Sequence, residues 1–258
     1  CQNAGIRFVF PKAILHLPDM GQDVDLLVQD RSRRIDALIA ESLGSSYAAG
    51  SLVNWISGKT GYNVGKYPSP VEIHHGRMGH LGEHNIYPHL LLRNSKDILI
   101  GKSKAFVPSP EDQLIIQVLQ RVYCHMIFRL SDIVSSIRLV QSIHLNWDYI
   151  VETTRRIGIF GGLCHHLSYI DQIFLSVFGK TVIPKKVSGL SKYEATGRVY
   201  LKNGFYSFPV FSVGSKLYLK KFVFELRDLN WDSLSRICLL PLLVIYIGLR
   251  SLGRWLFR

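Results

Sequence analysis

The alternation of apolar and polar positions predicts a sheet in the first hundred residues of the chain. Five short runs are either apolar or alternate with a period of two, the pattern of strands whose successive side chains point to opposite faces. Proline or glycine flanks several of these runs, as is typical of strand ends. The five runs are residues 6–10, 23–28, 71–74, 86–92 and 97–100.

Helical spacing of apolar residues dominates most of the remaining chain. Residues 33–43 place their apolar side chains on one face of a predicted helix. Ser109 and Pro110 mark a helix start, because serine caps free backbone N–H groups and proline suits the first turn. Apolar residues then recur at helical spacing as far as Leu130, which predicts one long helix. Further helices are predicted at residues 133–143, 146–157 and 163–178.

This order of elements predicts an α+β protein. We expect a mixed sheet with flanking helices at residues 1–107, followed by a mainly helical domain at residues 108–258. Within the second domain, the aromatic residues 199–224 predict a small β element. Its strands are expected at residues 199–201, 205–208 and 217–224, with a hairpin turn at Asn203-Gly204.

The last apolar segment, residues 237–249, carries no charge and precedes Arg250 and Arg254. It is shorter than the roughly 20 residues that a membrane-spanning helix needs. Two alternatives are open: a buried terminal helix, which we favour, and a weak contact with a membrane surface.

Composition bears mainly on the choice of partner. The 258 residues carry a net charge of +12, which favours anionic partners such as RNA, nucleotides or an anionic membrane. A hydrophobic content of 47% excludes a disordered chain. We expect no signal peptide. The widely spaced cysteines exclude a zinc knuckle and favour the reducing cytoplasm; they are Cys1, Cys124, Cys164 and Cys238.

Acidic residues on two predicted strands are the strongest indication of chemistry. Asp23 and Asp25 lie two residues apart on one strand, so their carboxylates project to the same side. Glu72 lies at the centre of another short strand. Two carboxylates on one strand and a third on its neighbour are typical of sites that hold Mg²⁺ or Mn²⁺ for phosphoryl transfer. Asp23, Asp25 and Glu72 are therefore our candidate metal ligands and catalytic residues.

The order of these motifs resembles a known family. A strand exit at Lys12 is followed by Asp-x-Asp-Leu-Leu-Val from Asp23, a helix, and Glu72-Ile73-His74. Pro-x-Pro-Glu-Asp at 108–112 and His-x-x-x-Arg-Leu-x-Asp at 125–132 come next. Over roughly residues 6–140, this order resembles the uncharacterised nucleotidyltransferases of the polymerase-β-like superfamily. Two positions depart from the family: Lys12-Ala13 replaces Lys-Gly or Gly-Ser, and Glu72 replaces the commoner aspartate.

The resemblance implies an enzyme that transfers a nucleoside monophosphate from a nucleoside triphosphate, such as ATP, to a hydroxyl group. Lys12, at a strand end, would neutralise a phosphate. The resemblance also implies that His74 packs beside the metal site and that His125 and Arg129, one helical turn apart, face the nucleotide. A core histidine and an Arg129–Asp132 surface pair are the alternative reading of that helix.

The sequence does not distinguish among RNA, protein and small molecules as the acceptor, because one fold can serve many substrates. The basic charge favours a polyanion such as tRNA. The alternative function is a non-catalytic protein that binds a nucleotide or nucleic acid on the same scaffold.

Two other motifs are weighed and rejected. His80-Leu81-Gly82-Glu83-His84 matches a zinc-protease pattern, but that site needs a helix, and the surrounding glycines predict an exposed loop. Gly58-Lys59-Thr60 resembles the end of a phosphate-binding loop, but Val53 occupies the position of the required glycine.

Overall fold

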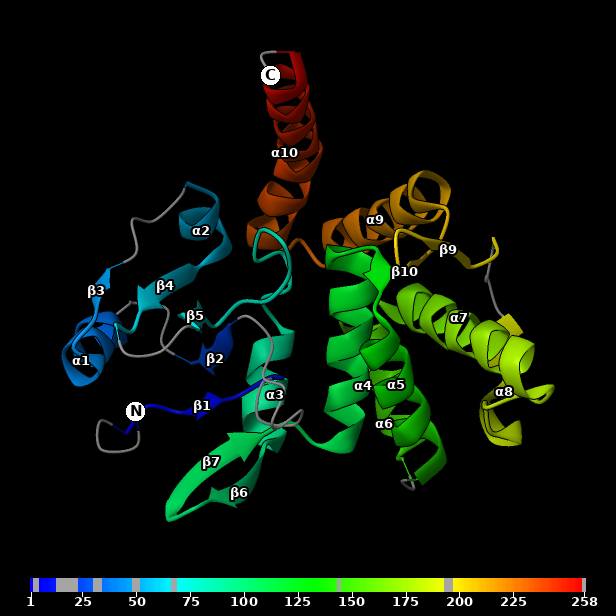
Figure 1. Cartoon of the computed structure of the whole chain (residues 1–258), viewed down its shortest axis with the longest axis horizontal. Helices are drawn as coiled ribbons and strands as arrows, with labels where there is room; N and C mark the ends of the chain where they lie inside the picture. Colours follow the sequence, from blue (N-terminus) through cyan, green and yellow to red (C-terminus); the bar gives the residue numbers. More distant parts are fainter. Residues whose placement is uncertain are drawn as a thin grey trace.

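A five-stranded mixed sheet forms one side of the molecule, and helices form the other (Figure 1). The computed structural model describes residues 1, 5–12, 23–29, 34–47, 52–65, 69–142, 145–192 and 197–256. The α+β architecture predicted from the sequence is confirmed. In the order β1-β2-β5-β4-β3, the strands are Phe8–Val9, Val24–Val28, Val71–His75, Lys59–Asn63 and Ser46–Tyr47.

The parallel pairing of β2 with β5 sets the geometry of the sheet centre. Asp25 lies opposite Glu72, and Leu27 lies opposite His74. The other described pairs of this sheet are antiparallel. Because side chains alternate along a strand, Asp25 and Leu27 project on one face while Leu26 and Val28 project on the other.

Each face of the sheet packs against helices. Helix α1 covers one face, where Ile35 and Ile39 pack against Leu26, Val28 and Ile73. On the other face, Val9 and Leu27 join the main core, which α3 and α4 also enter. These helices are α1 (Arg34–Leu43), α3 (Tyr87–Asn94) and α4 (Pro110–Val118). The face that carries Asp25 is therefore turned towards the helical part of the molecule.

Buried polar contacts fix α1 to the sheet. The Asp36 carboxylate accepts hydrogen bonds from the Tyr62 hydroxyl at 2.6 Å and from Thr60 at 3.2 Å. It also lies 3.2 Å from the His75 ring, which is on the opposite side of β5 from His74. This buried network holds β4, β5 and α1 together.

The helical part begins with α4, whose N-terminal cap is Ser109 as predicted, with its hydroxyl 3.1 Å from the Asp112 backbone nitrogen. The longer helices, α4 to α7 with α9, surround one core of apolar residues (Figure 1). The remaining helices are α2 (Leu52–Ser57), α5 (Leu130–Ser142), α6 (Trp147–Arg156), α7 (Phe160–Phe178), α8 (Ser188–Lys192), α9 (Val210–Arg227) and α10 (Trp231–Leu256), with a short 3₁₀ turn at Lys185–Val187.

Two small antiparallel sheets complete the described structure. Strands β6 (Lys96–Ile100) and β7 (Ser103–Val107) form a hairpin, and β8 (Ile127–Phe128), β10 (Phe205–Ser207) and β9 (Tyr200–Lys202) form a three-stranded sheet. The predicted hairpin turn at Asn203-Gly204 is confirmed: both residues have positive φ, 51° and 78°. That conformation is the one that an Asn-Gly turn supplies between strands.

Two predicted strands are wrong. Residues 86–92 form most of α3 rather than a strand, because Tyr87, Leu90 and Leu91 must all reach the same core. Residues 217–224 belong to α9, where Val213 and Leu217 are buried one helical turn apart. In both segments, packing on one side overrides the local composition.

The long helix predicted as far as Leu130 is also wrong. After α4 the chain winds as a π-helix at Leu119–Cys124 and then enters β8. Met126, between the two, has φ of 57°, a conformation that non-glycine residues seldom adopt. His125 and Arg129 consequently do not share a helix face.

Helix α10 leaves the body of the protein after its first turns (Figure 1). Ser233, Leu234 and Ile237 are buried, whereas Leu239 and Leu242 are exposed. The favoured prediction of a buried terminal helix is therefore wrong for the described part of residues 237–249. None of the helices in the described ranges combines the length and the apolar character needed to cross a membrane.

Asp232 anchors the start of α10. Its carboxylate accepts hydrogen bonds from Arg77, from Asn85 at 2.7 Å and from Arg236 at 3.3 Å. Partial burial alone would raise the pKa of Asp232, but the hydrogen bonds and the charges of the two arginines lower that pKa to about 2.

Replacing Asp232 by alanine tests this anchor. We expect the free energy of unfolding to fall by about 1–2 kcal/mol, a modest loss because the carboxylate is partly exposed. Urea unfolding measures it. Because the folded-state pKa is depressed, the contribution of Asp232 is complete above about pH 4 and is lost as the pH falls towards 2.

Asp148→Ala is the matched control. Asp148 forms an ion pair with Lys186 at 3.2 Å, with both side chains well exposed. Its loss should change the free energy of unfolding by less than about 1 kcal/mol. An equal loss in the two variants would contradict the role of Asp232 as an anchor.

Candidate functional site

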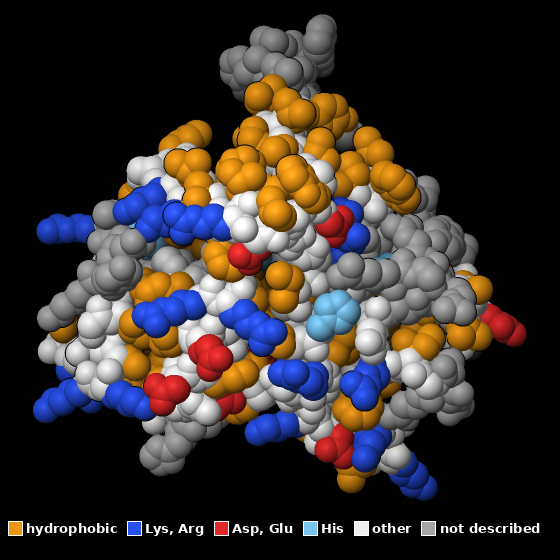
Figure 2. Space-filling model, turned by 180° about the vertical axis from the view of Figure 1, so that it is seen from behind, with side chains coloured by type: hydrophobic (Ala, Val, Ile, Leu, Met, Phe, Trp, Pro, Cys, Tyr) orange, Lys and Arg blue, Asp and Glu red, His pale blue; other side chains and the backbone are white. Residues whose placement is uncertain are grey.

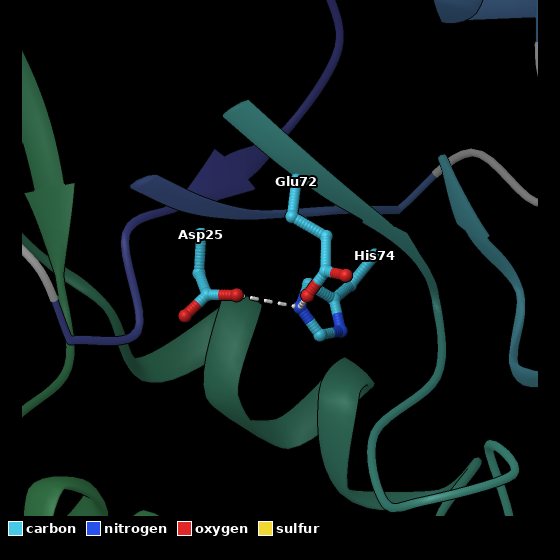
Figure 3. Close-up of side chains that lie close together, drawn as sticks. All are labelled: Asp25, Glu72 and His74. Carbon is cyan, nitrogen blue, oxygen red and sulfur yellow. Dashed lines mark hydrogen bonds and ion pairs between the residues drawn. The ribbon is translucent and has the colours of Figure 1, made fainter. Parts of the chain in front are cut away.

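Three side chains from β2 and β5 meet on the face of the sheet that is turned towards the helices (Figure 3). They are Asp25, Glu72 and His74. The His74 Nε2 atom lies 2.9 Å from Asp25 Oδ1 and 3.3 Å from Glu72 Oε2. One ligand atom from each residue lies within 4.8 Å of the other two, which is close enough for a single metal ion to contact all three.

The pairing of β2 with β5 explains this convergence. Asp25 and Glu72 are direct neighbours across the parallel pair, and His74 follows Glu72 by two residues on the same face. Asp25 is almost fully buried, while Glu72 and His74 keep partial contact with solvent. Asp25 therefore lies deepest in the site, His74 is less buried, and Glu72 is the most exposed of the three.

Two lysines neutralise the carboxylates. Lys12, at the exit from β1, forms an ion pair with the second oxygen of Asp25. Lys59 on β4 donates a hydrogen bond to Glu72 Oε2 at 3.0 Å. Each acidic residue thus faces one ammonium group and shares the same histidine.

These partners outweigh burial in setting the acidity of the site. Burial alone would raise the pKa of Asp25, but its hydrogen bonds and ion pairs with His74 and Lys12 hold that pKa well below its usual range. Burial acts on Glu72 in the same direction, and His74 and Lys59 lower the pKa of Glu72 to about 2. Both carboxylates are therefore ionised at neutral pH.

This donor set fits a divalent cation. Two carboxylates and one imidazole are ligands that Mn²⁺ accepts, and the carboxylate oxygens also suit Mg²⁺. Lys12 contacts Asp25 Oδ2 whereas His74 contacts Oδ1, so an ion held at Oδ1 would repel the Lys12 ammonium and compete with it for the carboxylate. The site therefore has the chemistry to exchange a resident lysine contact for a metal.

The structure unites most, not all, of the predicted site residues. Lys12, Asp25, Glu72 and His74 lie together. Asp23 lies in the bend before β2 and is not part of the group of ligand atoms within 4.8 Å of one another. Its role as a metal ligand stays a prediction.

His125 and Arg129 lie on opposite sides of β8 in the chain. Partial burial of the His125 ring, together with the charges of Arg121, Lys12 and Arg129, lowers the pKa of His125 to about 4. His125 is thus neutral at pH 7 and close enough to Lys12 to feel its charge. The alternative reading pairs Arg129 with Asp132. The Asp132 carboxylate instead forms an ion pair with Arg121 at 3.1 Å and accepts a hydrogen bond from the Arg129 backbone N–H at 2.8 Å.

The histidine-rich segment between β5 and α3 is a loop and not a zinc-binding helix, as predicted, but the prediction that it is exposed is wrong, because Met78 and residues 81–85 are buried. His80 is exposed whereas His84 is buried, so the two rings do not share one face. The buried Glu83 accepts hydrogen bonds from the backbone N–H groups of His80 and Leu81. Gly79 has φ of 99°, and a side chain there would collide with the Glu83 carboxylate.

Lys59 is the site residue that the sequence analysis missed. Its ammonium reaches Glu72 because β4 runs antiparallel beside β5. The only sequence signal was its place in Gly58-Lys59-Thr60, a motif correctly rejected as a phosphate-binding loop. Strand pairing, which that motif does not reveal, brings Lys59 to the site.

Comparison with known proteins adds no relative: no family model matches the chain, and no curated protein matches it significantly. The chemistry of this site therefore has to be argued from its own residues.

Mn²⁺ binding tests the donor set directly. Asp25→Asn and Glu72→Gln each remove one charged ligand, and we expect the dissociation constant of Mn²⁺ to rise by at least about 10–100-fold. Titration calorimetry on the full chain measures it. Asp97→Asn, at an exposed carboxylate that pairs with Lys104, is the matched control and should leave the affinity nearly unchanged. An equal loss in Asp97→Asn would contradict the donor set, and Asp23→Asn in the same titration tests whether Asp23 is a further ligand.

Proposed function

We propose that this protein is a metal-dependent nucleotidyltransferase, which transfers a nucleoside monophosphate from a nucleoside triphosphate to a hydroxyl group. The observation that carries the proposal is the Asp25–Glu72–His74 cluster on adjacent strands of a mixed sheet, with Lys12 in direct contact. Sites that transfer phosphoryl groups act mainly by positioning and by neutralising charge, and this cluster supplies both.

The reaction has simple stoichiometry. The acceptor hydroxyl releases its proton to solvent water and forms a new bond to the α-phosphorus, while the bond from the α-phosphorus to the bridging oxygen breaks and pyrophosphate leaves with that electron pair. A bound Mg²⁺ or Mn²⁺ would supply charge neutralisation of the phosphates. Asp25 would hold that ion, and Glu72 would complete a second metal site and favour deprotonation of the incoming hydroxyl.

Lys12 has a distinct place in this scheme. Its ammonium balances the negative charge of Asp25, and a bound metal ion would balance that charge instead. Lys12 would then be free to bind a phosphate oxygen as a compact positive charge.

Basic groups from the helical part support binding of a triphosphate. The charges of Arg121, Lys12 and Arg129 all act on the ring of His125. This arrangement places positive charge beside the acidic cluster, as a substrate with several negative charges requires. The net charge of +12 also favours a negatively charged acceptor, such as the polyanion tRNA.

A non-catalytic binding protein is the second candidate. Its support is that Lys12 and Lys59 form ion pairs with the two carboxylates and so balance their charge. Such a protein would bind a nucleotide or nucleic acid and form no product.

Label transfer distinguishes the two candidates. Full-length protein is incubated with each α-labelled nucleoside triphosphate, Mg²⁺ or Mn²⁺, total RNA and cell extract, and labelled products are separated by size. We expect transfer by the wild type and a loss of at least about 10²–10³-fold in Asp25→Asn, because the metal loses its buried ligand.

Asp97→Asn is the matched control for that assay. Asp97 pairs with Lys104 at 2.8 Å on the exposed β6–β7 hairpin, away from the cluster. This variant should transfer label like the wild type. Triphosphate binding without any labelled product would favour the binding protein, and equal transfer by Asp25→Asn would refute the proposed role of Asp25.

Lys12→Ala separates metal binding from triphosphate binding. Removal of the competing ammonium should tighten Mn²⁺ binding to the free protein, whereas loss of a phosphate contact should weaken binding of the metal–triphosphate complex. Calorimetric titrations with Mn²⁺ alone and with Mn²⁺ plus a non-hydrolysable triphosphate measure both. If both affinities rose or both fell in Lys12→Ala, this would contradict the proposal that Lys12 moves from the Asp25 carboxylate to a phosphate.

A further inference from the structure

A large apolar surface is exposed on α9 and α10, and Figure 2 shows hydrophobic side chains gathered where α10 projects from the body. We call it the α9–α10 surface. It includes Phe211, which is 89% exposed, and Trp231, which is 69% exposed. Its members are Phe211, Leu219, Val223, Leu226, Leu229, Trp231, Leu239, Leu242, Val244, Ile245 and Tyr246.

The surface is too large to be incidental. Burial of a large apolar side chain is favourable, so leaving this many of them in water is costly unless a partner covers them. Contiguous apolar patches of this kind on soluble domains mark sites that contact a partner. The buried residues of α9, such as Val213 and Leu217, already fill the core, so the outer residues are not needed there.

The exposed charges beside this surface are mainly positive. Lys216, Lys220 and Arg227 are exposed on α9, and Asp228 is the acidic residue exposed next to them. In the sequence of α10, no acidic residue follows Asp232, and Arg250 and Arg254 follow its apolar segment. Figure 2 shows Lys and Arg side chains directly beside the hydrophobic patch.

The distribution of apolar residues around α10 indicates what kind of partner covers it. Leu242, Val244, Ile245 and Tyr246 project in several directions around the helix axis, and all are exposed. One partner helix would cover a single stripe, whereas lipid surrounds a helix on several sides. Trp231 and Tyr246 also have the amphipathic rings that are enriched at membrane–water interfaces.

We propose that the α9–α10 surface binds the interfacial region of an anionic lipid bilayer. The apolar side chains enter the boundary between headgroups and acyl chains, and Lys216, Lys220 and Arg227 contact the anionic headgroups. This inference is independent of the nucleotidyltransferase chemistry.

Vesicle flotation with the full chain tests it. The probes are vesicles of phosphatidylcholine alone and vesicles with 30% phosphatidylserine. We expect binding at least about tenfold tighter to the anionic vesicles, and a loss of more than about tenfold in Lys216→Glu/Lys220→Glu, because each basic group near the surface adds to the attraction. Ile245→Ser/Tyr246→Ser should weaken binding to a similar degree. It should change the salt dependence of binding less than Lys216→Glu/Lys220→Glu does, because it removes no charge.

Lys96→Glu/Lys102→Glu is the matched control, because it reverses two exposed lysines on the β6–β7 hairpin at the opposite end of the molecule (Figure 1). It changes the net charge equally and should float like the wild type. If the two charge-reversed variants lost vesicle binding equally, the binding would depend on net charge alone, and the proposal would be overturned. The proposal would also be overturned if the wild type bound neither kind of vesicle and instead formed a dimer that Ile245→Ser/Tyr246→Ser abolishes. Light scattering measures the dimer.

Discussion

The register between β2 and β5 is the constraint on which the candidate site depends. It puts Asp25 opposite Glu72 and leaves His74 two residues further along, on the same face. A slip of one residue in β2 would turn Asp25 towards α1 and send Leu26 to the site face. The apolar residues beneath α1 therefore fix the register, and the register fixes the site. Core packing and the geometry of the Asp25–Glu72–His74 cluster are two consequences of the same pairing.

The sequence predicts the acidic centre well because its signal is local. A period of two in residues 71–74 and a polar start to residues 23–28 place Asp25 and Glu72 on strands, and both are found there. What brings them together is the parallel pairing, which the sequence suggests only through resemblance to a family. Lys59 lies beside Glu72 because β4 pairs with β5 in antiparallel fashion, and the sequence around Lys59 carries no pattern that predicts this pairing. Asp23, two residues before Asp25, falls in a bend, where the alternation of a strand no longer fixes its direction.

The helical part was predicted less well, because its deviations arise from tertiary packing. Residues 86–92 and 217–224 have strand-like compositions, yet each must bury residues on one side against the common core, and a helix does this better. The passage from Leu119 to Phe128 is a different case. Apolar spacing continues through it, but a π-helix and the positive φ of Met126 turn the chain into β8. π-Helical turns often occur near functional sites, and this one places His125 within reach of the charge of Lys12.

The base of α10 is held by polar contacts with the loop that follows β5. Ser233 donates a hydrogen bond to the Glu83 carbonyl oxygen at 2.9 Å, and Arg236 donates one to the Leu81 carbonyl oxygen at 2.9 Å. The same loop begins directly after the strand that carries Glu72 and His74. The start of α10 and the candidate site thus belong to one rigid framework. Because these contacts and the buried Leu234 and Ile237 already secure the helix, the exposed apolar residues beyond them add nothing to this attachment, and a role in contacting a partner accounts for them better than a role in folding.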